Sequence, residues 1–195
     1  MSKTELATLA GGCFWCTEAI FQRLRGINRV TPGYAGGNMA RPTYEQVSNQ
    51  DRLPPGKQGH AESIQFEFDP RVISYKKLLD IFWHTHNPTT IDRQGNDRGP
   101  QYRSIIFYHN LRQKREAEKS KIDLEKENTY PDPIVTEIRP YTDFCAAEDY
   151  HKNYYERHRG SDSYCDLVIG PKIHKLLEKY GRNIEPEYKQ VEFLI

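Results

Sequence analysis

The stretch Leu6-Ala7-Thr8-Leu9-Ala10-Gly11-Gly12-Cys13-Phe14-Trp15-Cys16-Thr17-Glu18 joins a strand-like run to a helix-like run. A thiol at a helix start faces unpaired backbone N–H groups and the positive end of the helix dipole, and both favour the reactive thiolate. The aromatic residues Phe14 and Trp15 can form an apolar pocket beside that sulfur. The stretch therefore predicts a nucleophilic Cys13 that suits a small, apolar and oxidised substrate. A buried structural cysteine is the alternative.

Helical and strand-like patterns are mixed along the rest of the chain, which predicts an α+β or α/β domain. Apolar periodicity and capping residues predict strands at 5–10, 62–68, 104–108 and 134–138, the second of them half-buried because its apolar residues alternate with polar ones. The same signals predict helices at 13–24, 74–84, 112–127, 146–158 and 171–180. Long loops at 38–59 and 87–101 are the kind of segment that often carries function.

The bulk composition is that of a soluble protein without a polyanionic partner. The chain has 195 residues, which predicts a single catalytic domain over 1–195, and its net charge of +1 gives no reason to expect binding to nucleic acid or to a membrane. No apolar run is long enough to span a bilayer, and the N-terminus does not resemble a signal peptide. Four cysteines are too few for a disulfide scaffold, so we expect a cytoplasmic protein whose cysteines serve redox or metal chemistry.

Cys16 lies one helical turn after Cys13, within disulfide reach if the segment is helical. The Cys-x-x-Cys spacing alone allows a redox pair, half of a zinc site or a coincidence. A zinc site needs two further ligands, and the sequence contains no second Cys-x-x-Cys and no His-x-x-x-His. We therefore expect a redox pair and no bound metal.

Several separate segments resemble type A peptide methionine sulfoxide reductases in order and spacing, from about residue 8 to about residue 180. They are Gly12-Cys13-Phe14-Trp15, Gly33-Tyr34-Ala35-Gly36-Gly37, Gly59-His60-Ala61-Glu62, the run from Gly95 to Ser104, Ala147-Glu148-Asp149-Tyr150-His151, and the run from Tyr164-Cys165 to Pro171-Lys172. The resemblance implies a compact two-layer α+β domain with a central mixed sheet, flanking helices and long active-site loops. Residues 181–195 form a C-terminal tail outside it.

The resemblance also implies roles for site residues. Cys13 would attack the sulfur of methionine S-sulfoxide, free or in proteins, and Glu62 would donate a proton to the sulfoxide oxygen. Phe14 and Trp15 would hold the S-methyl group, Tyr34 and Tyr102 would hydrogen-bond the oxygen, and Asp97 would order the polar side of the pocket. The chemistry agrees, because sulfoxide oxygen is a poor leaving group unless protonated, and burial in an apolar pocket raises the pKa of a carboxyl.

Recycling has two candidate thiols. A sulfenic acid condenses readily with a nearby thiol, and Cys16 is close in sequence, whereas Cys165 matches a position where other members carry a recycling cysteine. Our hypothesis is that Cys16 resolves first and Cys165 relays the oxidation to the surface, after which thioredoxin reduces the disulfide by exchange. We expect a monomer that needs no cofactor. We interpret Cys145 as a packing residue, His60 and His151 as structural hydrogen-bonding residues, and His84 and His86 as favouring the negative end of a helix dipole.

Two other functions stay open at this level. A general Cys-x-x-Cys disulfide oxidoreductase would act on a disulfide-linked protein and would not depend on Glu62. A zinc-stabilised binding module would bind metal and catalyse nothing.

Overall fold

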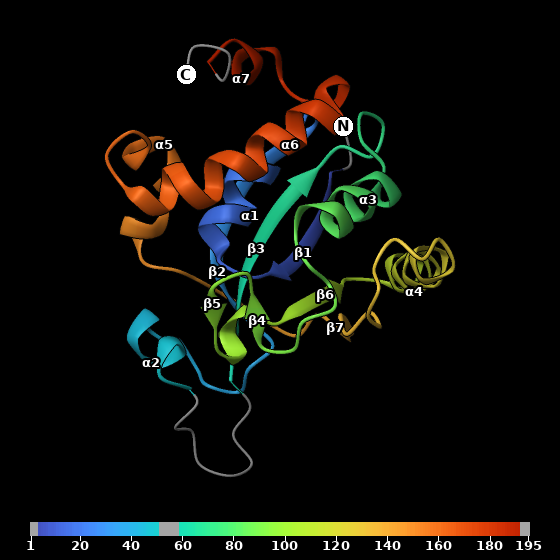
Figure 1. Cartoon of the computed structure of the whole chain (residues 1–195). Helices are drawn as coiled ribbons and strands as arrows, with labels where there is room; N and C mark the ends of the chain where they lie inside the picture. The colour runs from blue at the N-terminus through green and yellow to red at the C-terminus, as the bar shows by residue number, and fades with distance from the viewer. Residues whose placement is uncertain (1–3, 51–58, 192–195) are drawn as a thin grey trace.

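A mixed six-stranded sheet forms the centre of the computed structural model, which describes residues 4–50 and 59–191 (Figure 1). Its strand order is β7-β6-β1-β3-β2-β8, and β6 and β7 run parallel whereas the other neighbouring pairs are antiparallel. The strands are β1 (Glu5–Gly11), β2 (Ile27–Ala35), β3 (Ala61–Phe68), β6 (Ser104–Tyr108), β7 (Glu137–Pro140) and β8 (Phe144–Ala146). A separate pair, β4 (Arg93–Gln94) and β5 (Asp97–Arg98), lies in the second long loop. The α+β class with a central mixed sheet is confirmed.

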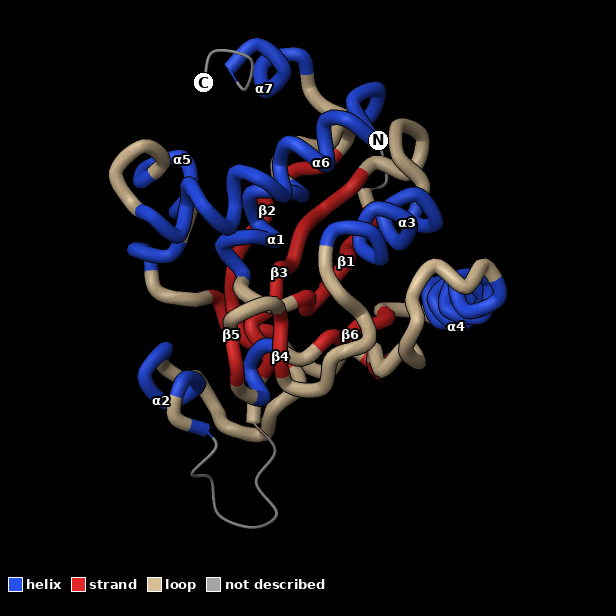
Figure 2. Tube along the Cα trace, viewed as in Figure 1, coloured by secondary structure: helices blue, strands red, loops and turns tan. Residues whose placement is uncertain are grey.

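Helices form the second layer (Figure 2). The helix α6 (Gly170–Tyr180) packs against both α1 (Phe14–Phe21) and α3 (Tyr75–Thr85), while α4 (Leu111–Lys126) packs against α3, β6 and β7. The shorter helices are α2 (Tyr44–Ser48), α5 (Tyr154–His158) and α7 (Pro186–Val191), and a π-helical turn at Cys165–Ile169 leads directly into α6. Short 3₁₀ turns lie at Pro100–Tyr102, Asp149–His151 and Gly181–Asn183. In the described part of the chain, no helix has the length and apolar character that crossing a membrane requires.

The strand β3 lies between β1 and β2; both of its faces are buried from Ala61 to Ile64, whereas Gln65 and Glu67 are partly exposed. Ile64 and Phe66 belong to the main core beneath the helices, whereas Ala61 packs with Phe107 in a smaller core on the other face. The expected half-buried pattern therefore holds from Ile64 to Phe68 and fails at 61–63, where the alternation does not reveal the second, smaller core. Side chains alternate across a strand, so Glu62 shares the face of Ile64 and points toward the helices.

Two expected elements differ in the structure. The predicted helix over 146–158 is replaced by the end of β8, a 3₁₀ turn and the short α5. Asn153 has a left-handed φ of 51°, and its N–H donates to the carboxylate of Glu18 at 2.9 Å, so a contact with α1 interrupts the helical path. The last predicted strand begins at Glu137 rather than residue 134, because its bounds are set by parallel pairing with β6.

The tail after α6 packs against the domain. Ile184 is fully buried and forms an isolated β-bridge with Leu24. The guanidinium of Arg23 lies 4.8 Å from the ring centre of Tyr188. The described part of the tail, 181–191, thus continues the fold of the domain.

Candidate active site

Cys13 occupies the N-cap of α1, directly after β1. Its carbonyl accepts the N–H groups of Cys16 at 3.1 Å and Thr17 at 3.3 Å, so both cysteines belong to the first helical turn. The turn depends on Gly12, whose φ is +92° and where a Cβ atom would lie 2.5 Å from the Cγ atom of Gln94. A glycine is required there for conformation and for space.

The carboxyl group of Glu62 lies at the same helix start. The backbone N–H of Phe14 donates to Oε2 of Glu62 at 3.0 Å, so the carboxyl accepts one of the unpaired N–H groups of the helix. Glu62 is only 1 % exposed, and burial, with the nearby charges of Asp97 and Cys16, raises its pKa to about 8. At neutral pH the side chain therefore holds a proton that it can donate.

A cavity of about 60 Å³ brings Cys13 and Glu62 together. A cavity of this size holds a few water-sized groups. Its lining contains most of the residues that the sequence singled out, together with two additional tyrosines: Cys13, Phe14, Trp15, Tyr44, Glu62, Asp97, Tyr102 and Tyr164. Tyr44 comes from a long polar loop whose sequence gives no sign that it lines a site. Tyr164 directly precedes Cys165, the candidate recycling thiol, and this position was a sign that Tyr164 could lie at the site.

Trp15 is fixed by aromatic neighbours. Its ring stacks on Tyr154 with centroids 3.7 Å apart and nearly parallel planes, and the ring of Tyr164 meets it edge-on at 5.9 Å. The indole Nε1–H donates to Nδ1 of His151 at 3.1 Å. Burial lowers the pKa of His151, so its neutral imidazole can accept this bond. The apolar wall of the cavity is thereby held in one orientation.

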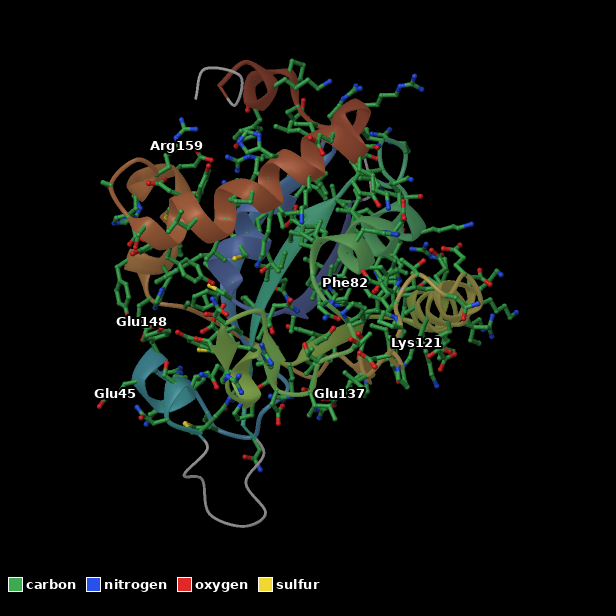
Figure 3. All side chains as sticks on the ribbon, viewed as in Figure 1. Glu45, Phe82, Lys121, Glu137, Glu148 and Arg159 are labelled. Carbon is green, nitrogen blue, oxygen red and sulfur yellow. The ribbon has the colours of Figure 1, made fainter. Side chains whose placement is uncertain are left out.

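Tyr34 does not line the cavity, which differs from the expected contact with a substrate oxygen. It pairs in register with Glu62 on the neighbouring strand, but its hydroxyl donates to Oε2 of Glu148 at 2.9 Å. The other carboxylate oxygen of Glu148 accepts the backbone N–H of Tyr44 at 2.8 Å, and Glu148 lies beside α2 (Figure 3). Tyr34 therefore supports the segment that carries Tyr44, and the hydroxyls available to a ligand belong to other tyrosines.

Tyr164 closes the cavity from the C-terminal segment. Its hydroxyl donates to Oδ2 of Asp97 at 2.7 Å and lies 3.7 Å from the sulfur of Cys16. Burial and the two neighbouring sulfurs raise its pKa above the ordinary value, so the hydroxyl keeps its proton. Asp97 thus orients a phenol over the two cysteines.

Cys13 and Cys16 share a proton. The Cys13 thiol is hydrogen-bonded to the Cys16 sulfur, which lowers the pKa of Cys16 to about 6, with help from the charge of Lys172. Burial, followed by the Cys16 sulfur, raises the pKa of Cys13 well above its ordinary value. The expectation that the helix start favours a Cys13 thiolate is therefore wrong for the resting site, because burial outweighs the helix dipole. Near neutral pH the pair therefore carries one proton and one negative charge, and it titrates as a unit.

Cys165 is buried in the same small apolar cluster as Cys13 and Cys16. All four cysteines are free thiols. Burial, together with the carboxylates of Asp162 and Asp166, raises the pKa of Cys165 to about 11. At neutral pH Cys165 is consequently a thiol, unlike Cys16.

The remaining histidines and Cys145 lie outside the cavity lining. His60 contacts the Met39 carbonyl through Nε2 at 2.8 Å and accepts the Gly37 N–H, which confirms its structural role. His84 and His86 each contact a carbonyl of α3 at 2.7 Å. Burial lowers the pKa of His86 to about 4, so its ring is neutral and the expected interaction with the helix dipole is wrong for this residue. Cys145 lies in the edge strand β8, partly exposed. Within residues 4–50 and 59–191, no three His, Cys, Asp or Glu side chains gather as metal ligands.

Comparison with known proteins gives a consistent result. The family model described as "Peptide methionine sulfoxide reductase" matches residues 5–185. "Peptide methionine sulfoxide reductase MsrA" of Saccharolobus solfataricus is 47 % identical over 181 residues, which cover 93 % of this chain and 97 % of that protein. The reduced form of Mxr1 from Saccharomyces cerevisiae is 32 % identical, with a TM-score of 0.74 over 84 % of this chain and 90 % of Mxr1. Mxr1 in complex with Trx2 is 28 % identical, with a TM-score of 0.54 over 78 % of this chain and 85 % of that chain.

Proposed function

The chain belongs to the peptide methionine sulfoxide reductase family, and we propose that it reduces the S epimer of methionine sulfoxide, free or in proteins, with Cys13 as nucleophile and Glu62 as acid. It is an oxidoreductase that returns methionine sulfoxide to methionine. The observation that carries the assignment of roles is the meeting of Cys13 and a protonated Glu62 in one small cavity with an aromatic wall. A nucleophile and an acid must face opposite ends of the same S–O bond.

The cavity offers a complementary site to each part of the sulfoxide. Phe14 and Trp15 form an apolar wall for the S-methyl group, while Glu62, Tyr44 and Tyr102 present groups that can bond the oxygen. Burial raises the pKa of both tyrosines, so their hydroxyls remain donors. Donors fixed before substrate arrives stabilise charge as it develops on the oxygen. In this proposal Tyr44 takes the oxygen-binding position that the sequence suggested for Tyr34.

The first step transfers oxygen from the substrate to the enzyme. The Cys13 proton moves along its hydrogen bond to Cys16, and the Cys13 thiolate attacks the sulfoxide sulfur while Glu62 protonates the oxygen. The attack forms a bond between the Cys13 sulfur and the substrate sulfur. That bond and the substrate S–O bond then break as the hydroxyl group passes to the Cys13 sulfur, where a new S–O bond forms. Methionine leaves, reduced by two electrons, and Cys13 becomes a sulfenic acid, oxidised by two electrons.

The second stage returns Cys13 to its thiol. We infer that Cys16 condenses with the sulfenic acid first and that Cys165 then exchanges with the Cys13–Cys16 disulfide. The position of Cys16 in the same helical turn and the burial of Cys165 in the same cluster support this order. Thioredoxin reduces the final disulfide by exchange, in line with the complex of the related Mxr1 with Trx2.

We further propose that the enzyme works as a monomer in a reducing compartment such as the cytoplasm. The use of only four cysteines, too few for a disulfide scaffold, supports the reducing compartment.

The deciding experiment follows racemic N-acetyl-methionine sulfoxide on a chiral column with excess dithiothreitol. We expect the S epimer to disappear, the R epimer to persist, and Cys13→Ser to be inactive. Cys145→Ser is the matched control because Cys145 lies outside the cavity lining, and it should match the wild type. Consumption of the R epimer, or full activity in Cys13→Ser, overturns the proposal.

A further inference from the structure

Lys172 in the first turn of α6 points its ammonium at Cys16 in α1. Its Nζ atom lies 3.2 Å from the Cys16 sulfur. The two residues are 156 positions apart in sequence, so the packing of α6 against α1 brings them together. No carboxylate of the described residues forms an ion pair with Lys172, so its charge is directed at the sulfur.

Cys16 needs such a partner because it is only 1 % exposed. A buried anion is strongly unfavourable unless charged or polar groups replace the water that it has lost. The titratable groups that face Cys16 are Cys13 on α1, Glu62 on β3, Tyr164 and Cys165 on the segment before α6, and Lys172 on α6; the buried His86 lies near Lys172. Among these groups Lys172 is the cation.

Cys165 has the opposite surroundings. Its backbone N–H contacts the Asp162 carboxylate, and Asp166 follows it directly. These two negative charges disfavour a thiolate at Cys165. The two candidate resolving cysteines are both close to Cys13, but a cation accompanies one and carboxylates accompany the other.

We propose that Lys172 is a positioning residue that holds Cys16 as a thiolate beside Cys13 and thereby selects Cys16, rather than Cys165, to resolve the sulfenic acid first. The proposal rests on the proposed function, because it needs a sulfenic acid on Cys13. In the step, Cys16 gives up the proton that it took from Cys13 in the first step, and its thiolate supplies an electron pair to the Cys13 sulfur. An S–S bond forms and the S–O bond of Cys13 breaks. The leaving hydroxide takes a proton to become water; Cys16 is oxidised and Cys13 is reduced by the same amount.

The test is a single turnover of the full chain with N-acetyl-methionine S-sulfoxide and no added reductant, quenched with acid at intervals between pH 5 and 9. Released methionine measures the first step, and peptide mass spectrometry measures the Cys13–Cys16 and Cys13–Cys165 disulfides separately. The variants are Lys172→Met, Lys172→Gln and Lys172→Arg. Lys175→Met is the matched control, since Lys175 lies one turn away on the same helix and is exposed.

In Lys172→Met and Lys172→Gln, we expect the pH midpoint for forming the Cys13–Cys16 bond to rise by about one to three units, the effect of removing an opposite charge at this range. The share of the Cys13–Cys165 bond should grow. Lys172→Arg should stay near the wild-type midpoint because it keeps the charge, and Lys175→Met should match the wild type. A thiol of higher pKa is also the better nucleophile, so the midpoint is more informative than the rate at one pH.

The role of Lys172 is overturned if Lys172→Met and Lys172→Gln both have the same pH midpoint and the same ratio of the two disulfides as Lys175→Met. Methionine release in the same samples shows that the active site is folded. A wild-type chain that releases no methionine overturns the proposed function itself, so the two failures are distinguishable.

Discussion

Glu62→Gln removes the acidic proton of the cavity while keeping the size of the side chain and an oxygen that can accept the Phe14 N–H. The pKa of Glu62 is raised to about 8 by burial, by Asp97 and by Cys16. A carboxyl with this pKa is protonated for about 90 % of the time at pH 7, whereas one at its ordinary value is protonated for about 0.3 %. Burial therefore increases the population of the acid about 300-fold, which corresponds to about 3 kcal/mol.

The variant should lose the contribution of general acid catalysis, about 10²- to 10⁴-fold in the methionine-forming step. The wild-type rate should rise with pH through about 6, where the Cys13–Cys16 pair loses the first of its two protons and keeps the shared one, and fall above about 8, where Glu62 loses its proton. The fall above 8 should be absent in Glu62→Gln. Single-turnover release of methionine between pH 5 and 9 measures both features.

Glu67→Gln is the matched control, because Glu67 lies on the same strand with a partly exposed side chain and only a distant ion pair to Arg29 at 4.0 Å. It should match the wild type at every pH. A Glu62→Gln rate within tenfold of the wild type, or an unchanged fall above pH 8, would refute Glu62 as the acid.

Three further changes test other parts of the site. Cys16→Ser should move the acidic limb of the same single-turnover profile to higher pH, because Cys13 loses the sulfur that takes its proton; an unmoved limb contradicts the shared proton. Burial raises the pKa of Glu18 from 4.5 to about 7, so the folded state binds the carboxyl proton of Glu18 more tightly than the unfolded state does. The free energy of unfolding should therefore fall as the pH rises from about 4.5 to about 7. The fall is at most about 3 kcal/mol and should be absent from urea titrations of Glu18→Gln. Gly12→Ala should lower the free energy of unfolding by about 1–3 kcal/mol, and by more than Gly95→Ala, which has a positive φ but no atom within 4 Å of the added Cβ.

Local sequence was sufficient where a position depends on near neighbours. The glycine pair between a strand pattern and a helix pattern predicted that Cys13 begins a helix, and the structure has Cys13 as the N-cap of α1. The helix predicted from residue 74 has Ser74 as its N-cap, whose Oγ accepts the Lys77 N–H at 3.2 Å. Glu62 is two residues before Ile64 and four before Phe66 in the same strand, so its side chain lies on their face, toward the helices. Each of these follows from the period of a helix or a strand.

Helix and strand periodicity could not predict the contacts between segments that are distant in the sequence. The sequence predicted Tyr34 for the oxygen contact and gave no sign of Tyr44, whereas a hydrogen bond from Tyr34 to Glu148, 114 positions away, directs the Tyr34 hydroxyl out of the cavity. The helix expected over 146–158 is interrupted where Asn153 bonds Glu18, 135 positions away.

The sequence by itself thus determined the class of fold, the position of Cys13 at a helix start and the face of the strand on which Glu62 lies, because these depend on chain direction and side-chain alternation. Tertiary structure alone decided which tyrosines face the cavity and which cysteine carries the charge. A pKa depends on the groups within a few ångströms of a side chain, and for Cys16 one of these is Lys172, brought in by α6. Periodicity in one segment contains no information about which helix will pack against it.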